Sequence, residues 1–208
     1  MRYLLLSSLL FGMLSCRTVY KDLQTTPGNI SALQPFKPAF TVALYNTSVD
    51  VVGNHLSGLL LIKRMPDSTL RMVFSNEMGF KFFDFEFTTA GGFKVYSIMK
   101  KMNRKSVLKT LRKDFQILMM EQLDPNRMEV RRDSSNNRYY IFPQPKGYNC
   151  YVVNGNGLLR MERSSNSKPV ATMIMQRYNN GIPDTIGISH QNFNFTIGLK
   201  RIEKNAGE

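Results

Sequence analysis

The feature of this sequence that most limits its fold is a long series of short segments rich in β-branched and aromatic residues, separated by turn-forming residues. Gly91 and Gly92, the run 154–157 and the run 179–181 are typical of hairpin turns. This pattern predicts an antiparallel sheet. The predicted strands cover residues 40–45, 55–64, 69–75, 80–88, 93–98, 128–132, 138–142, 148–153, 158–163, 170–178, 185–189 and 193–202.

The segment 80–88 has the clearest strand pattern, because Phe83, Phe85 and Phe87 alternate with Asp84 and Glu86. Successive side chains of a strand point to opposite faces of the sheet. The three phenylalanines are therefore expected on the buried face. We interpret the two carboxylates as a solvent-exposed face of the strand, in preference to a catalytic pair.

One segment, 104–122, has helical spacing instead. Its apolar residues are Leu108, Leu111, Phe115, Leu118 and Met119. We expect the helix to be closed by Asp124 and Pro125, because proline cannot continue the helical hydrogen bonds. One helix is too narrow to cover a flat sheet of about a dozen strands. The predicted fold class is therefore mainly β (α+β): a curved antiparallel sheet forming an incomplete β-barrel around one amphipathic helix, with an apolar cavity inside.

The N-terminus has the layout of an export signal. Met1 and Arg2 precede an apolar run over residues 3–14, which is shorter than the roughly 20 residues that a helix needs to span a bilayer. The run ends in Met13, Leu14, Ser15 and Cys16, which resemble the lipobox at which bacterial lipoproteins are cleaved. The resemblance implies that Cys16 becomes the acylated first residue. The alternative is a plain secretory signal with an incidental cysteine.

We predict three parts of the chain: a signal peptide over 1–15, a lipidated N-terminus with a polar, proline-containing tether over 16–38, and one domain over 39–204. Acylation of Cys16 leaves Cys150 without a disulfide partner, and its apolar neighbours indicate a buried, inert thiol. The net charge of +13 fits an acidic surface such as anionic lipid or nucleic acid. Export argues against nucleic acid.

The order of the elements resembles the LolA/LolB family of bacterial lipoprotein carriers and receptors, and is closest to the outer-membrane lipoprotein LolB. The local likeness extends from Leu59 to about Met120. It includes the strand 70–74, the loop Ser75-Asn76-Glu77-Met78-Gly79 and the phenylalanine strand that follows. The resemblance implies an incomplete barrel that encloses acyl chains. Met78 is the position that matches the family's protruding, membrane-inserting loop residue.

Methionine and phenylalanine side chains adapt well to irregular apolar ligands. With the resemblance, they suggest a candidate apolar cavity, and the alternative is an ordinary core. The cavity residues would be Met72, Phe74, Phe83, Phe85, Phe87, Leu111, Phe115, Met119, Met173 and Met175. The stretch from Lys100 to Lys113 contains seven cations and no acidic residue, so it is either a site for anionic head groups or a solvated helix face.

Nothing in the sequence indicates catalysis. His55 and His190 are not spaced as a local metal pair, and no nucleophile has a sequence-adjacent partner. We expect no enzyme activity, no cofactor and no metal. The predicted function is a monomeric lipoprotein, anchored in the outer membrane facing the periplasm, that binds acyl chains or lipidated proteins and receives lipoproteins from a periplasmic carrier protein. The alternatives are an interaction lipoprotein with a filled core and an enzyme that acts on envelope polymers.

Overall fold

The computed structural model describes residues 19–51, 53–121 and 123–202. These residues form a 13-stranded antiparallel sheet in the order β1-β7-β8-β9-β10-β11-β12-β13-β2-β3-β4-β5-β6. The strands are β1 (Gln24–Thr25), β2 (Val42–Val51), β3 (Asn54–Arg64), β4 (Leu70–Ser75), β5 (Lys81–Phe87), β6 (Phe93–Ile98), β7 (Glu129–Arg132), β8 (Arg138–Gln144), β9 (Gly147–Asn154), β10 (Gly157–Ser164), β11 (Pro169–Asn179), β12 (Ile182–His190) and β13 (Phe195–Arg201).

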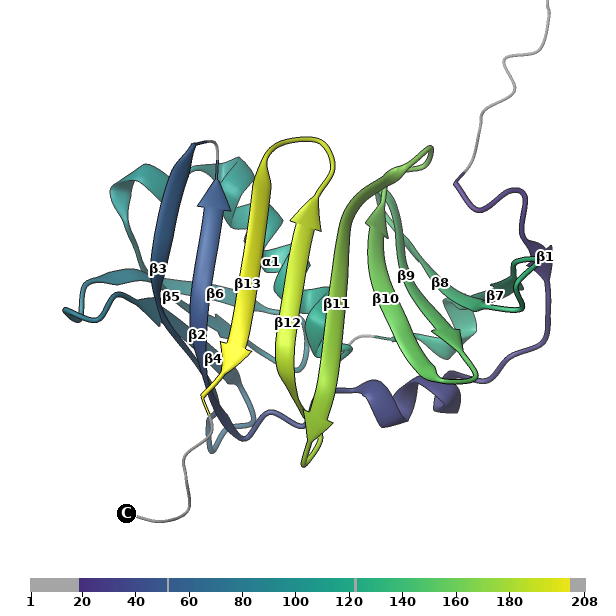
Figure 1. Ribbon diagram of the computed structural model, residues 1–208, viewed down its shortest axis with the longest axis horizontal. Helices are drawn as coiled ribbons and strands as arrows, with labels where there is room; N and C mark the ends of the chain where they lie inside the picture. Colours follow the sequence, from purple (N-terminus) through teal and green to yellow (C-terminus); the bar gives the residue numbers. More distant parts are fainter. Residues whose placement is uncertain (1–18, 52, 122, 203–208) are drawn as a thin grey trace, which may run out of the picture.

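The sheet curves around the long helix α1 (Lys105–Met119), which lies behind β11, β12 and β13 in Figure 1. Three short 3-10 helices complete the fold: η1 (Ile30–Phe36), η2 (Lys100–Met102) and η3 (Pro125–Arg127). The two edge strands, β1 and β6, do not pair with each other, so the sheet is not closed. The structure confirms the predicted fold class of a curved, incomplete barrel around one amphipathic helix.

Two runs of consecutive hairpins are joined by one pairing between distant parts of the sequence. β13 pairs with β2, from Phe195 opposite Val51 to Arg201 opposite Tyr45. This pairing places the last strand in the middle of the sheet. The strand boundaries follow the predicted segments closely, although β2 begins at Val42 and continues to Val51, beyond the predicted end at residue 45.

The helix is shorter than predicted. α1 ends at Met119, and its C-cap Met120 adopts the left-handed conformation with φ 52°. A non-glycine residue in that conformation ends the regular hydrogen-bond ladder. The helix therefore ends before Asp124 and Pro125, which instead begin the short helix η3.

Strand β5 carries the aromatic centre of the core. Phe83, Phe85 and Phe87 are buried on the concave face, as predicted, and the Phe83 and Phe85 rings stack with centroids 4.3 Å apart. From α1, Phe115 contacts the rings of Phe83 and Phe87 at centroid distances of 6.0 and 6.3 Å. Aromatic pairs at these distances contribute beyond the area they bury. The ring cluster therefore joins the helix to the sheet.

The expectation of a solvent-exposed Asp84 is wrong. Asp84 lies on the convex face but is only 2% exposed, because Arg71 of the neighbouring strand donates to its two carboxylate oxygens over 2.8 and 3.0 Å. The Arg71 guanidinium also lies 4.1 Å from the ring centroid of Tyr96, so together they cover the carboxylate. The hydrogen bond from Arg71 lowers the pKa of Asp84 below its ordinary value.

Residues 19–38, which the sequence predicts as part of a tether, contact the domain from Val19 onward. Tyr20 packs against the rings of Tyr139 and Tyr148, and its hydroxyl donates to Glu162 over 2.7 Å. β1 pairs with β7, and Leu33 of η1 is fully buried. Residues 1–18, which include the predicted division after residue 15, lie outside the described part of the chain. The predicted domain boundary after residue 38 stays a prediction.

Candidate functional site

The concave face of the sheet is the candidate binding surface, and α1 covers it. All ten predicted cavity residues are buried, with exposed fractions between 0 and 4%. They belong to one continuous core cluster, to which β11 contributes Met173 and Met175. Their role as a cavity lining stays a prediction, because in this conformation they pack mainly against one another and against α1.

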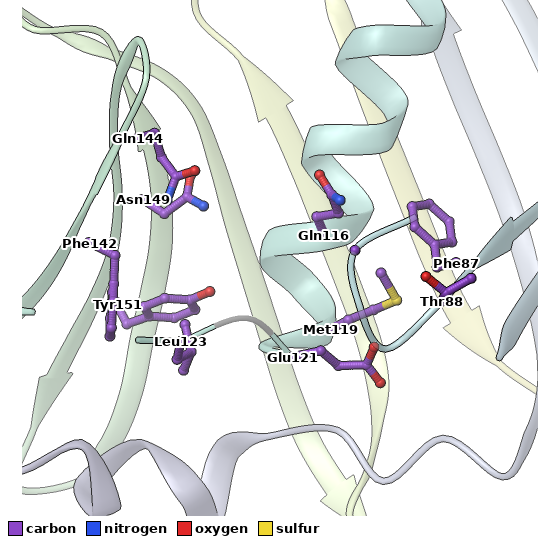
Figure 2. Close-up of a pocket in the computed structure, with 11 residues that line it drawn as sticks. Phe87, Thr88, Gln116, Met119, Glu121, Leu123, Phe142, Gln144, Asn149 and Tyr151 are labelled. Carbon is purple, nitrogen blue, oxygen red and sulfur yellow. The ribbon is translucent and has the colours of Figure 1, made fainter. Parts of the chain in front are cut away.

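One small pocket opens between the C-terminal half of α1 and strands β8 and β9 (Figure 2). It has a volume of about 70 Å³ and is lined by Phe87, Thr88, Gly91, Gln116, Met119, Glu121, Leu123, Phe142, Gln144, Asn149 and Tyr151. Sites for drug-sized ligands measure roughly 300 to 1,000 Å³. The pocket has room for a few water molecules. A whole acyl chain would need α1 to move.

A buried polar cluster fastens the middle of α1 to the sheet. Asp114 is fully buried and accepts a hydrogen bond from Arg163 Nε of β10 at 3.1 Å, and Arg163 Nη2 forms an ion pair with the same oxygen at 3.0 Å. His190 Nε2 of β12 lies at hydrogen-bond distance, 2.8 Å, from the other carboxylate oxygen. Among the described residues, Nδ1 of His190 has no hydrogen-bond partner. We call these three residues the helix clasp.

Sequence reasoning missed the helix clasp, although one signal was present. Asp114 lies three residues after Leu111 and four before Leu118, so it occupies the apolar face of the helix. A carboxylate on that face needs a buried partner. The sequence does not reveal that Arg163 and His190, 49 and 76 residues later, supply it.

Two further hydrogen bonds connect α1 to the sheet and its turns. Arg112 donates to the Gly91 carbonyl oxygen over 2.8 Å, and the Tyr151 hydroxyl donates to the Ile117 carbonyl oxygen over 3.1 Å. Burial is the main cause that raises the pKa of the Tyr151 hydroxyl above its ordinary value. Tyr151 therefore stays a neutral donor beside the pocket.

A second pocket of about 70 Å³, next to the helix clasp, is polar and cationic. It is lined by Lys113, Gln116, Gln144, Lys146, Tyr148, Asn149 and Arg163. Burial, together with the nearby charges of Arg163, Lys109 and Lys146, lowers the pKa of Lys113. Its lining contains three cations, Lys113, Lys146 and Arg163, and the last of these is paired with Asp114.

Met78 occupies the turn between β4 and β5 and is 92% exposed. Phe80 in the same turn is 53% exposed, and its ring contacts the buried Phe82 with centroids 5.7 Å apart. Sequence reasoning identified Met78 and missed Phe80. The exposure of Met78 fits a protruding loop residue, while its role in membrane insertion stays a prediction.

Two residues that the sequence analysis considered as possible ligands or nucleophiles, His55 and Cys150, line neither of the pockets described above. His55 contacts Asp50 over 2.7 Å at the surface. Cys150 is buried, as predicted, and burial raises the pKa of its thiol well above the ordinary value.

The described residues contain no group of three or more His, Cys, Asp or Glu that could hold a metal ion. Within the same residues, no helix is long and apolar enough to cross a bilayer. Cys16 lies outside the described part of the chain.

No family model matches this sequence, and no curated protein matches it. Several solved structures are similar to the chain, among them the following three. A DUF1329 family protein from Desulfovibrio piger is 11% identical, with a TM-score of 0.46 over 86% of this chain and 91% of that one. A LolA superfamily protein from Nitrosomonas europaea is 8% identical, with a TM-score of 0.48 over 86% of this chain and 93% of that one.

The third structure is a candidate outer membrane lipoprotein-sorting domain from Vibrio parahaemolyticus, 9% identical, with a TM-score of 0.42 over 81% of this chain and 87% of that one. The solved structures similar to this chain thus include LolA superfamily and DUF1329 proteins.

Proposed function

We propose that this protein is a non-catalytic lipoprotein that binds an acyl chain, free or attached to a lipidated protein, between α1 and the concave face of the sheet. The observation that carries the proposal is that α1 covers the concave face of the sheet. A wide apolar wall, with methionines and phenylalanines from β4, β5 and β11, is covered mainly by one helix that a small polar clasp holds in place.

Binding would replace part of the contact between the helix and the sheet. When α1 moves outward, the apolar wall becomes exposed to water. A bound acyl chain then stabilises the complex by about 25 cal/mol for each Å² of apolar surface that it removes from water. The pocket beside Met119 and Tyr151 is the natural point of entry, because the space between helix and sheet already opens there. The process is partitioning without a chemical step.

Three parts of the proposal concern the membrane. Cys16 would carry the lipid that anchors the protein in the outer membrane, facing the periplasm. A periplasmic carrier protein would deliver the cargo, which the protein would pass on as a monomer. Met78 would insert into the bilayer during this transfer, since it is the most exposed large apolar residue among the described residues.

Native mass spectrometry of the mature chain with Cys16→Ser, before and after addition of palmitoylated peptide, tests cargo binding. We expect one acyl species per protein. Asp114→Asn should speed its uptake several-fold, because the variant removes the charge that holds Arg163 at the helix. Asp84→Asn is the matched control, since it removes a buried ion pair on the convex face, away from α1. A protein that stays empty under all these conditions contradicts the carrier proposal.

The role of Met78 is tested by transfer of bound acyl peptide to vesicles. Met78→Glu should leave binding unchanged and slow transfer at least tenfold. Val42→Glu is the control, because Val42 is also an exposed apolar residue, 57% exposed, but lies at the other end of the strands. Equal slowing of transfer by the two substitutions would contradict a specific role of Met78.

A second candidate function is favoured by the same packing. The ten apolar residues are at most 4% exposed, and the pocket beside them holds only about 70 Å³. These values fit a filled core, in which case the protein is an interaction lipoprotein that binds through its surface. An empty protein in the mass spectrometry experiment would leave this function as the better account.

A further inference from the structure

The hairpins divide the turns of the sheet into two sets of five at opposite ends of the strands. We call one set the anchor end and the other the far end. The anchor-end turns connect β2 to β3, β4 to β5, β8 to β9, β10 to β11 and β12 to β13. The far-end turns cover residues 65–69, 88–92, 133–137, 155–156 and 180–181.

The chain enters the domain at the anchor end. The Val19 backbone N–H donates over 2.8 Å to the carbonyl oxygen of Asn166, which lies in the turn between β10 and β11. The next residue, Tyr20, is fixed by hydrogen bonds of its hydroxyl to Glu162 and Ser164. Only residues 17 and 18 separate Val19 from Cys16, and three peptide steps reach at most about 11 Å. A lipid on Cys16 therefore holds the anchor end close to the bilayer.

The two ends differ in charge. The anchor-end turns contain Lys146 and Lys168, and the link from β6 to α1 at the same end adds Lys100, Lys101 and Arg104, against one acidic residue, Glu77. This link lies at the anchor end because the Met99 N–H donates to the Phe82 carbonyl oxygen at the beginning of β5. The far-end turns, all within the described residues, contain Asp67 and Asp133 and no lysine or arginine.

The two ends also differ in exposed apolar side chains. Met78, Phe80 and Phe193 are 92, 53 and 42% exposed, and all three lie in anchor-end turns. Every other exposed large apolar residue in the described part of the chain lies on a strand. Exposed aromatic or methionine side chains on the same surface as lysines are typical of a surface that lies at the head-group level of a membrane.

We propose that the anchor end docks on an anionic lipid bilayer, with the lysines and Arg104 on the head groups and Phe193 and Met78 inserted at their level. The proposal rests on the proposed function only for the lipid on Cys16. The cationic pocket of Lys113, Lys146 and Arg163 opens near this end and adds to its positive charge. The far end, with the acidic turns, then faces away from the membrane.

Vesicle co-sedimentation of the mature chain with Cys16→Ser tests the docking without the lipid anchor. We expect binding to vesicles of phosphatidylethanolamine with about one third phosphatidylglycerol, and not to phosphatidylcholine. Replacing each anchor-end cation by glutamine should weaken the partition coefficient about fivefold per residue. The matched control replaces five exposed cations elsewhere and changes the net charge equally: Lys37, Lys63, Arg132, Arg138 and Lys200.

The orientation is tested with an inserted reporter, because the sequence contains no tryptophan. Phe193→Trp is expected to shift its emission to the blue on vesicle binding and to be quenched by brominated lipid. Ser135→Trp, in a far-end turn, should keep its emission unchanged. Near-ultraviolet circular dichroism checks that both variants are folded.

Each outcome decides the proposal. Loss of binding in the anchor-end set alone, with quenching of the reporter at position 193 alone, supports it, even if the protein carries no acyl cargo. Equal loss in both charge sets, or quenching of the reporter at position 135, overturns it. The proposal is also overturned if the protein does not bind vesicles but binds an acidic polypeptide through the same lysines, because the surface would then fit a protein partner. Failure of cargo binding concerns the proposed function and leaves this orientation intact.

Discussion

Removing the carboxylate of the helix clasp should destabilise the whole domain. In Asp114→Ala, Arg163 and His190 lose their shared acceptor in a site where the His190 side chain is fully buried and Arg163 is 15% exposed. Breaking a buried ion pair from one side typically costs about 3 to 5 kcal/mol, because the remaining charge stays buried without a partner. For a domain of this size, that loss corresponds to a fall of roughly 6 to 20 °C in Tm.

Urea unfolding followed by circular dichroism measures the loss. The free energy of unfolding should fall by the amount above while the m-value stays constant, since the same surface is exposed on unfolding. Glu77→Ala, which removes an exposed carboxylate from a turn, should change the free energy by less than about 0.5 kcal/mol. Hydrogen exchange should show the largest loss of protection in α1. A loss below about 1 kcal/mol for Asp114→Ala refutes the inference that the clasp fastens the helix.

Three further predictions follow from single residues. With Cys16 replaced, the Cys150 thiol should not react with a thiol reagent at pH 8 until the protein unfolds, because burial raises its pKa; rapid labelling of folded protein would contradict this. The folded-state pKa of Asp84 lies below its unfolded value near 3.8, so the stabilisation from its ionised form is complete above pH 3.8 and is lost as the pH falls through the folded pKa. The free energy of unfolding of Asp84→Asn should therefore depend less steeply on pH in acid. An unchanged slope would count against the ion pair. Gly147→Ala should lower the free energy of unfolding by at least about 2 kcal/mol, since φ is +95° and a Cβ would lie 1.8 Å from the Ser164 carbonyl oxygen. Gly155→Ala, where nothing lies within 4 Å of an added Cβ, should lower it much less. Thermal unfolding of both variants measures the difference.

Local patterns were sufficient to predict most elements of the fold. The alternation of phenylalanines in β5 and the helical spacing from Leu108 to Met119 depend on neighbours in sequence, so the periods of 2.0 and 3.6 residues are visible without the structure. The burial of Cys150 could be expected from its apolar neighbours in sequence, whereas the protruding position of Met78 was expected from the resemblance to LolB. The left-handed conformation of Met120 could not, because the local sequence does not require it.

Only the tertiary structure decided how the two hairpin series join and how the helix is held. The pairing of β13 with β2, the helix clasp and the ion pair of Arg71 with Asp84 link residues 13 to about 150 positions apart, and a sequence pattern carries no information on such partners. The sequence by itself determined a curved sheet with one apolar face and a helix to cover it, because burial of that face requires a cover. Whether the helix fills the space or leaves it open depends on side-chain packing, which exists only once the chain is folded.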